Sequence, residues 1–232
     1  KNTQQITKAM KMVAAAKLKR AQDRVIAARP FAKKMSEVLG GLSARVSDDF
    51  SHPLLTERGD ENYLIVLVTA DKGLAGAFNA NVIKAAQAFI ADNPGKKFRM
   101  MAVGRKGRDF FKRREIDLTE EYVGITGTGT VRYSDAAEIG QNVIKTFTED
   151  ETIDKVFLIF TEFKTVLSQK PIVEQLLPIP KIASEGASEE AAQAEYIYEQ
   201  PPAEIFGKLL PKQVETQIYR SMLESVASEQ GS

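Results

Sequence analysis

The sequence predicts an α/β protein in which two long terminal helices flank a small domain with a largely parallel sheet. Three observations support this fold class. Residues 1–34 form a helix-favouring stretch, continuous apolar runs alternate with amphipathic segments through the middle, and residues 203–230 carry a second long helical pattern. Because the two helical stretches lie at opposite ends of the chain, they can pair antiparallel.

The opening stretch reads as one unbroken helix up to a kink expected at Arg29-Pro30. It is rich in Ala, Lys, Met, Gln and Arg, and no Gly or Pro precedes that step. One apolar stripe follows the helical period and consists of Ile6, Met10, Val13, Ala14, Ala21, Val25 and Ala28. This narrow stripe predicts a helix that packs against a single partner.

The same stretch is strongly cationic. Residues 1–34 contain ten Lys or Arg and one acid, Asp23, which gives a net charge of +9. The whole chain carries only +1, so residues 35–232 carry −8. This asymmetry favours a helix that lies close to an acidic surface, and an ordinary solvated surface helix is the alternative.

Composition excludes several classes of chemistry. The absence of Cys rules out disulfides, thiolate zinc sites and cysteine nucleophiles, and a single histidine, His52, rules out multi-histidine metal sites. No run approaches the roughly eighteen apolar residues of a membrane-spanning helix, and the N-terminal stretch does not resemble a signal peptide. We therefore expect no metal site, no cofactor and no membrane span.

After Pro30 the helical pattern resumes to Leu42, and residues 47–62 read as a linker. The apolar runs that follow predict strands at 63–69, 98–103, 121–125 and 155–161, and a more exposed strand at 170–178. Between them we expect a turn at 70–76, helices at 78–91 and 106–112, and a flexible loop at 124–130. A further helix is predicted from an N-cap at Ser134, with Glu138 near the capping-box position, to about 148. Alternating strands and helices at this spacing favour a parallel sheet.

The last third of the chain begins with a polar, acidic segment. Residues 181–194 read as a mobile loop, and residues 195–199 as a short edge strand. The second long helix follows, with a bend expected at Gly207 or Pro211. Its apolar residues recur every fourth position and form a ridge suited to packing along another helix, namely Leu210, Val214, Ile218, Met222 and Val226.

No catalytic constellation is found in the sequence. The turn at 70–76 joins a strand to a helix as a nucleotide-binding turn does, but it has only Gly73 and Gly76 where a dinucleotide site needs closely spaced glycines, so a tight turn is the favoured interpretation. The stretch 104–107 (GRKG) is too short to identify a nucleic-acid clamp. A phosphate-binding GxxxxGK[ST] loop is absent, so we expect a mechanical or binding role without catalytic residues.

Four sequence motifs resemble one family. NTQQITKAMKMVAAAKLKRAQDR with the following Arg-Pro step, VTADKGLAGAFNANV, SQKPIVEQLLPIP, and YIYE followed by VETQIYRSMLESVASEQ resemble, in order, segments of the gamma subunit of rotary F-type ATP synthase. The resemblance runs over nearly all of the chain. Family members begin earlier and continue beyond Gln230, so we expect this sequence to be truncated at both termini.

The resemblance implies the fold and the function of a central-stalk rotor. Residues 1–60 and 200–232 would form an antiparallel coiled coil, and residues 61–199 a Rossmann-like α/β domain. Such a subunit couples proton-driven rotation of the c ring to ATP synthesis or hydrolysis at the beta subunits, and is itself non-catalytic. The implied partners are the alpha and beta subunits, the epsilon subunit and the c-subunit ring. The implied location is peripheral to the membrane, on the cytoplasmic face of the bacterial inner membrane or its organellar equivalent.

The resemblance also implies two sets of contact residues. The set expected at the alpha/beta hexamer comprises Lys8, Met10, Lys11, Lys17, Ser228, Glu229 and Gln230, with Met10 opposite the end of the C-terminal helix. The set expected at the c ring comprises Tyr196, Tyr198 and Glu199. Aromatic residues with a charged neighbour suit a partly wet interface of this kind.

Two other function classes remain as alternatives. A nucleic-acid-binding protein could use the same basic helix, although cations around most of its faces and the lack of aromatic residues before Phe31 count against it. A small α/β enzyme could bind a nucleotide between Gly73 and Gly76. The resemblance implies neither.

Overall fold

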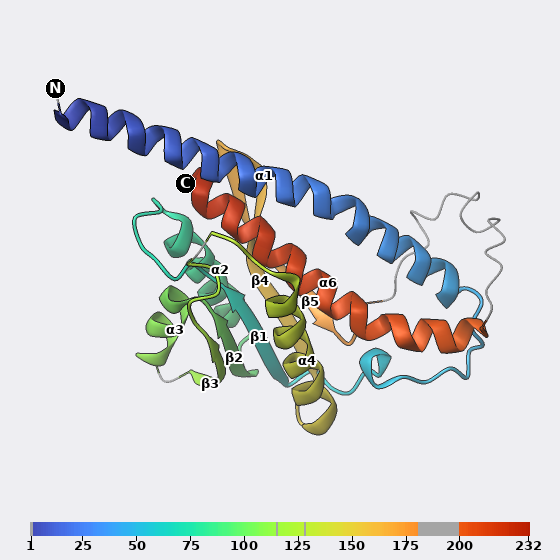
Figure 1. Cartoon of the computed structure of the whole chain (residues 1–232). Coiled ribbons are helices and arrows are strands. Elements are labelled where there is room, and N and C mark those ends of the chain that lie inside the picture. Colours follow the sequence, from blue (N-terminus) through green and yellow to red (C-terminus); the bar gives the residue numbers. More distant parts are fainter. Residues whose placement is uncertain (1, 115, 128, 181–199) are drawn as a thin grey trace.

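The computed structural model describes residues 2–114, 116–127, 129–180 and 200–232, with side chains described from residue 5. Its centre is a five-stranded sheet in the order β3-β2-β1-β4-β5. Helices α2 and α3 cover one face of this sheet, α4 and α6 cover the other, and α1 lies along the outside of α6 (Figure 1). The predicted fold class is confirmed.

The sheet is parallel except at one edge. Strands β1 (Asn62–Val68), β2 (Lys97–Val103), β3 (Asp117–Tyr122) and β4 (Lys155–Thr165) run parallel, and β5 (Ser168–Leu177) returns antiparallel to β4. The apolar runs of β1 and β4 become strands with both faces covered, as predicted. The third strand was wrongly predicted at 121–125 because β3 is an edge strand, whose half-exposed polar residues form no apolar run.

Three helices connect the strands. They are α2 (Phe78–Ala91), α3 (Arg105–Lys112) and α4 (Tyr133–Glu149), close to the predicted ranges. The predicted N-cap of α4 at Ser134, with Glu138 as its partner, is wrong. The N-cap is Arg132, two residues earlier, and the carboxylate of Asp135 accepts from the backbone N–H of Arg132 (3.4 Å) and from its guanidinium (2.8 Å).

The first helix, α1 (Asn2–Ser43), continues through Pro30 without interruption. The segment after it is packed rather than a free linker. It contains a short 3₁₀ helix, η1 (Pro53–Leu55), whose Leu54 is fully buried. The imidazole of His52 accepts a hydrogen bond from Leu54 N–H (3.2 Å), which gives the only histidine of the sequence a structural role.

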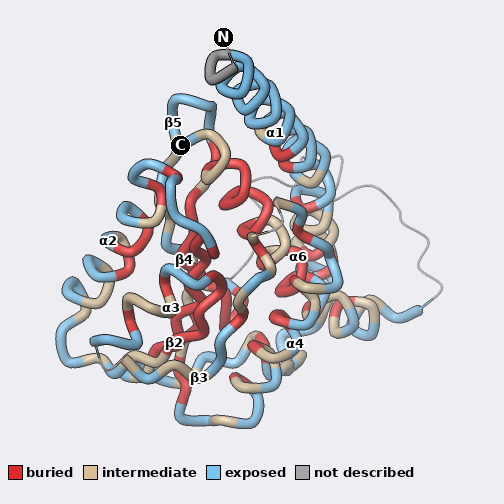
Figure 2. The backbone as a smooth tube through the Cα atoms, turned by 60° about the vertical axis from the view of Figure 1, so that its left-hand side comes forward, coloured by how far each residue is buried: buried red, intermediate tan, exposed pale blue. Residues whose placement is uncertain are grey.

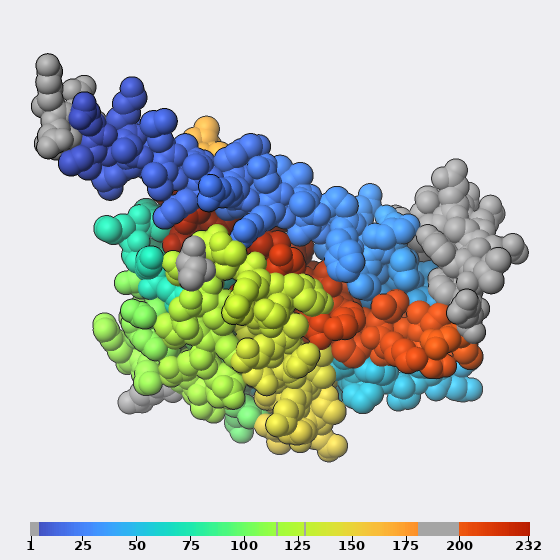
Figure 3. Space-filling view, viewed as in Figure 1, coloured from blue at the N-terminus to red at the C-terminus, as the bar shows by residue number. Residues whose placement is uncertain are grey.

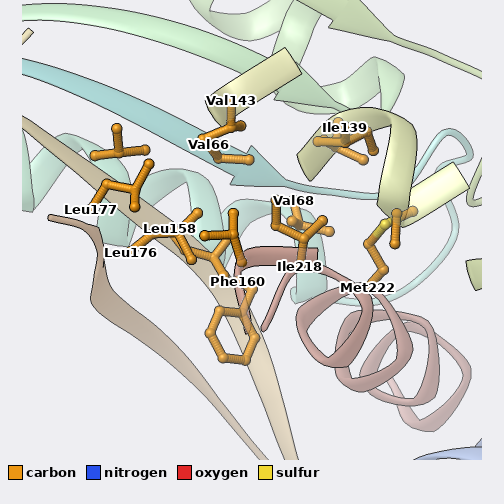
Figure 4. Packing of buried hydrophobic residues seen from close by; sticks show 14 of the residues in the cluster. Val66, Val68, Ile139, Val143, Leu158, Phe160, Leu176, Leu177, Ile218 and Met222 are labelled. Carbon is orange, nitrogen blue, oxygen red and sulfur yellow. The ribbon is translucent and has the colours of Figure 1, made fainter. Parts of the chain in front are cut away.

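The last helix, α6 (Pro202–Gly231), is the most deeply buried long element of the molecule (Figure 2). It runs antiparallel to α1 and continues through Gly207 and Pro211 (Figure 1). Every residue of the predicted apolar ridge is buried. Figure 4 shows Ile218 and Met222 of this ridge close to Val68 of β1 and Ile139 of α4.

One hydrophobic core cluster therefore joins the terminal helices to the sheet. It contains Val25 from α1, Val214 from α6 and Val66 from β1. In the described part of the chain, no helix combines the length and the apolar character needed to cross a membrane.

An ion pair between a partly exposed arginine and a buried carboxylate fixes α1 to α6. The side chain of Glu224 is 2% exposed and accepts hydrogen bonds from Arg29 Nε (3.0 Å) and Arg29 Nη2 (3.1 Å). The backbone of Phe163 in β4 completes the arrangement, because its N–H donates to Glu224 (2.8 Å) and its carbonyl accepts from Arg29 (2.6 Å). The hydrogen bond from Arg29 to the Glu224 side chain raises the pKa of Arg29, and the negative charges of Glu224 and Glu162 add to this effect while burial opposes it. Three elements distant in sequence thus meet at one carboxylate.

We expect Arg29→Ala to lower the free energy of unfolding by about 2 kcal/mol, because it leaves the buried Glu224 carboxylate without its cation, although Arg29 itself is partly exposed. The double variant Arg29→Leu/Glu224→Leu should recover part of this loss, since it also removes the buried charge. Urea unfolding monitored by circular dichroism measures both effects.

The matched control is Lys19→Ala, which breaks the exposed pair between Lys19 and Asp23 on the same helix. Exposed pairs contribute only about 0–1 kcal/mol. Equal losses in Arg29→Ala and Lys19→Ala would show that the Arg29–Glu224 pair does not fix the helices.

Candidate interaction site at the free ends of the terminal helices

The first turns of α1 project beyond the rest of the molecule (Figures 1 and 3). Along this projection Lys8, Lys11 and Lys17 are exposed, and Met10 is 67% exposed. The apolar stripe also remains uncovered here, with Val13 55% exposed. The projecting part of α1 therefore offers cations and apolar side chains together to a partner.

The helix pairing covers only the later part of the α1 stripe. Counting outward from the Arg29–Glu224 pair in two antiparallel helices places Ser232 near Ala21. Ala21 and Val25 are buried, in agreement with this register. Met10 lies about 16 Å further along α1, at roughly 1.5 Å per residue, so it is not beside the end of α6.

The three residues predicted at the end of α6 have different environments. Ser228 is fully buried, and its hydroxyl donates to the carbonyl of Thr161 in β4 (3.3 Å). Glu229 and Gln230 are partly exposed. Burial raises the pKa of Glu229 to about 7, and the negative charge of Asp71 adds to the effect, while Lys72 opposes it. The contact of the end of α6 with another subunit stays a prediction.

Two loops border the end of α6 and carry exposed apolar residues that the sequence analysis missed. Leu74 stands in the loop after β1, and Leu167 at the tip of the β4–β5 hairpin, and both are almost fully exposed. The C-terminal turn lies between these loops: a Cβ on Gly76 would be 3.0 Å from the carbonyl of Ser232, and one on Gly231 would be 3.5 Å from that of Val166. In the sequence, the sign of such a residue was the apolar Leu74 inside the turn predicted at 70–76.

The carboxylate of Asp71, in the turn after β1, accepts the hydrogen bonds of the surrounding backbone N–H groups. Asp71 accepts hydrogen bonds from the backbone N–H groups of Arg105 (3.0 Å), Gly124 (2.9 Å), Thr126 (3.0 Å) and Gly127 (2.9 Å). Burial alone would raise the pKa of Asp71, but these donors and the Thr126 hydroxyl outweigh it and lower the pKa. The donors at the carboxyl ends of the strands, which could otherwise hold a phosphate, are thus satisfied within the chain.

The two glycines of the 104–107 stretch have a packing role. Gly104 has φ +98, and a Cβ there would lie 2.2 Å from the carbonyl of Thr69. A Cβ on Gly107 would lie 2.9 Å from the Thr69 side chain, whose hydroxyl accepts from Gly107 N–H (2.9 Å). Both glycines allow α3 to approach β1 closely.

Within residues 2–114, 116–127, 129–180 and 200–232, no group of three or more His, Asp or Glu side chains is placed to hold a metal ion. The predicted c-ring residues Tyr196, Tyr198 and Glu199 lie outside the described residues, as do the predicted loop at 181–194 and the edge strand at 195–199.

Comparison with known proteins gives a consistent result. The family model described as ATP synthase matches residues 1–232. The chain is 47% identical over 232 residues to the ATP synthase gamma chain of Solibacter usitatus, covering 99% of this chain and 78% of that protein. It is 49% identical over 234 residues to the ATP synthase gamma chain of Geotalea daltonii, covering 100% of this chain and 78% of that protein.

A solved structure is also similar over most of its length. It is a chain from the central stalk and c ring of the mitochondrial ATP synthase of Tetrahymena thermophila. The two chains superpose with a TM-score of 0.67 at 27% identity, covering 97% of this chain and 95% of that one.

Glu229→Gln tests the environment at the end of α6. A carboxyl group whose pKa rises from 4.5 to about 7 on folding binds its proton more tightly in the folded state, so stability falls as pH rises through that window. Glu229→Gln has no carboxyl group to ionise at this position, so it does not lose this stability as pH rises. We expect its melting temperature to equal that of the wild type at pH 4 and to exceed it at pH 8 by roughly 2–6 °C.

The matched control is Glu151→Gln, which changes an exposed carboxylate in the loop between α4 and β4 and should leave the difference in melting temperature between the two pH values unchanged. A Glu229→Gln profile parallel to the wild type across this range would contradict the burial of this carboxyl group.

Proposed function

The chain belongs to the family of ATP synthase gamma chains, and from this premise we propose that it is the central-stalk rotor subunit of an F-type ATP synthase. In this role it turns with the c ring and drives the catalytic beta subunits through ATP synthesis, or is driven by them during hydrolysis.

The observation that carries the proposal is the pairing of α1 with α6 on the sheet. A shaft that transmits torque must not slide or twist along its pairing. The ion pair between Arg29 and Glu224 ties α1 to α6, and the Phe163 backbone ties both to β4. A turning force applied to the α/β part therefore reaches the projecting end of α1 through buried contacts.

The partners follow from the two ends of this shaft. The cationic projection of α1 suits acidic loops of an alpha/beta hexamer, with Lys8, Lys11 and Lys17 providing charge and Met10 apolar contact. Glu229 and Gln230 are proposed for the same contact, whereas the predicted contact at Ser228 does not fit its burial against β4. The c-ring contact is proposed at Tyr196, Tyr198 and Glu199, and the epsilon subunit completes the stalk.

The subunit itself is proposed to be non-catalytic. The donors around Asp71 that could bind a phosphate are satisfied by that carboxylate. The site of ATP chemistry is then on the beta subunits. The proposed location is peripheral to the membrane through the complex, on the cytoplasmic face in a bacterium.

A chimeric subunit tests the function. Residues 1–232 of this chain replace the matching region of the Geotalea daltonii gamma chain, and the chimera is combined with the other subunits of that enzyme. We expect restored ATP-driven proton pumping and rotation in single-molecule recordings. Pumping no better than in the enzyme without a gamma chain, despite assembly of the chimera, would reject the proposal.

The same chimera tests the contact residues. Replacing both Lys8 and Lys11 by Glu exchanges attraction for repulsion at an acidic partner. At about 0.2–1 kcal/mol per exposed pair, losing two pairs should weaken the contact roughly 2- to 30-fold, and we expect fewer protons to be pumped per ATP. Met10→Lys should also change coupling. Lys84→Glu on α2, an exposed cation on the opposite face of the sheet, is the control and should leave coupling unchanged. Equal coupling in all variants would contradict this placement.

A further inference from the structure

A cavity of about 390 Å³ lies between the edge strand β5 and α6, away from the projecting end of α1. Its volume falls within the range of small-molecule sites. The floor is apolar and is formed by Leu158, Leu176, Ile179 and Val214. All four are at most 8% exposed, so the floor is part of the packed core rather than a mobile surface.

One oxygen atom at this cavity is buried and lacks a hydrogen-bond partner in the described part of the chain. Gln213 lines the cavity, is 8% exposed, and its Oε1 accepts no hydrogen bond. Glu174 also lines the cavity; its side chain is 38% exposed, and its Oε2 pairs with Arg220 Nη2 at 2.5 Å. A buried acceptor without a donor is unfavourable, so a molecule that supplies N–H groups here gains an interaction that the chain does not provide.

From this combination we propose that the cavity binds a small aromatic amine in its cationic form. The ring lies on the apolar floor, and the N–H groups donate to Gln213 Oε1 and to the carboxylate of Glu174. The negative charge of Glu174 favours a cation and disfavours an anionic molecule of the same shape. The inference depends only on this cavity and is independent of the rotor function.

A molecule bound here contacts both α6 and the edge strand β5. Because it binds only the folded chain, it stabilises the docking of α6 on the sheet and raises the melting temperature as its concentration increases. The cavity is therefore a site at which a small molecule can strengthen the attachment of α6 to the edge of the sheet.

The probe is tryptamine, titrated into the 232-residue chain and followed by NMR chemical shifts. We expect saturation with a dissociation constant on the order of 1 mM, the affinity typical of a probe with about a dozen non-hydrogen atoms. Intermolecular NOEs should connect the indole ring to the methyl groups of Leu176, Ile179 and Val214. Shifts that do not saturate by about ten times that concentration, or NOEs to other methyl groups, would overturn the proposal.

Variants and analogues test each contact. Gln213→Leu should weaken tryptamine binding roughly five-fold, while Glu120→Gln, an exposed carboxylate at the opposite edge of the sheet, should not change it. On the wild-type chain, neutral 3-methylindole and anionic indole-3-propionate should bind successively more weakly than tryptamine. This ranking tests the charge preference even if Gln213→Leu does not fold. Equal affinity of the three analogues, or unchanged binding in a folded Gln213→Leu variant, would refute the proposal.

Discussion

Glu224 places a carboxylate where almost no water reaches it, and the arrangement of the long helices depends on how that charge is compensated. Removing a charge from water is costly unless a partner and hydrogen bonds replace the lost hydration. Here the partner, Arg29, comes from α1, and a further donor comes from the backbone of Phe163 in β4. The pairing therefore selects one register of α1 against α6 and one position of both on the sheet.

This constraint divides α1 into two parts with different roles. From about Ala21 onward the apolar stripe is covered by α6 and belongs to the main core. Before that point the same stripe and its lysines remain exposed, with Met10 and Val13 available to a partner. The rigid part can carry torque, and the projecting part can bind the surface against which the shaft turns.

Patterns of apolar residues allowed most of the fold to be predicted from the sequence. The runs of β1 and β4 and the four-residue ridge of α6 correspond to elements whose burial is set by their own side chains. The start of β3 was missed because an edge strand needs no apolar run. Glu224 was missed because an acid in a helix normally indicates a solvated face, and only its partner Arg29, distant in sequence, reveals its burial.

The family resemblance was enough to locate the contact residues proposed for the hexamer. It did not predict how exposed or buried each of them is. Exposure of Lys8 and Lys11 follows from the charge of the helix, whereas the exposure of Met10 depends on where α6 ends and the burial of Ser228 on the sheet beneath it. Native-state hydrogen exchange tests the central claim most directly. We predict that amides of residues 213–228 exchange only by global unfolding, as slowly as those of β1, while residues 5–16 exchange much faster. If α6 instead exchanged together with all of α1 and well before β1, the terminal helices would form a unit separate from the sheet, and the account would be wrong.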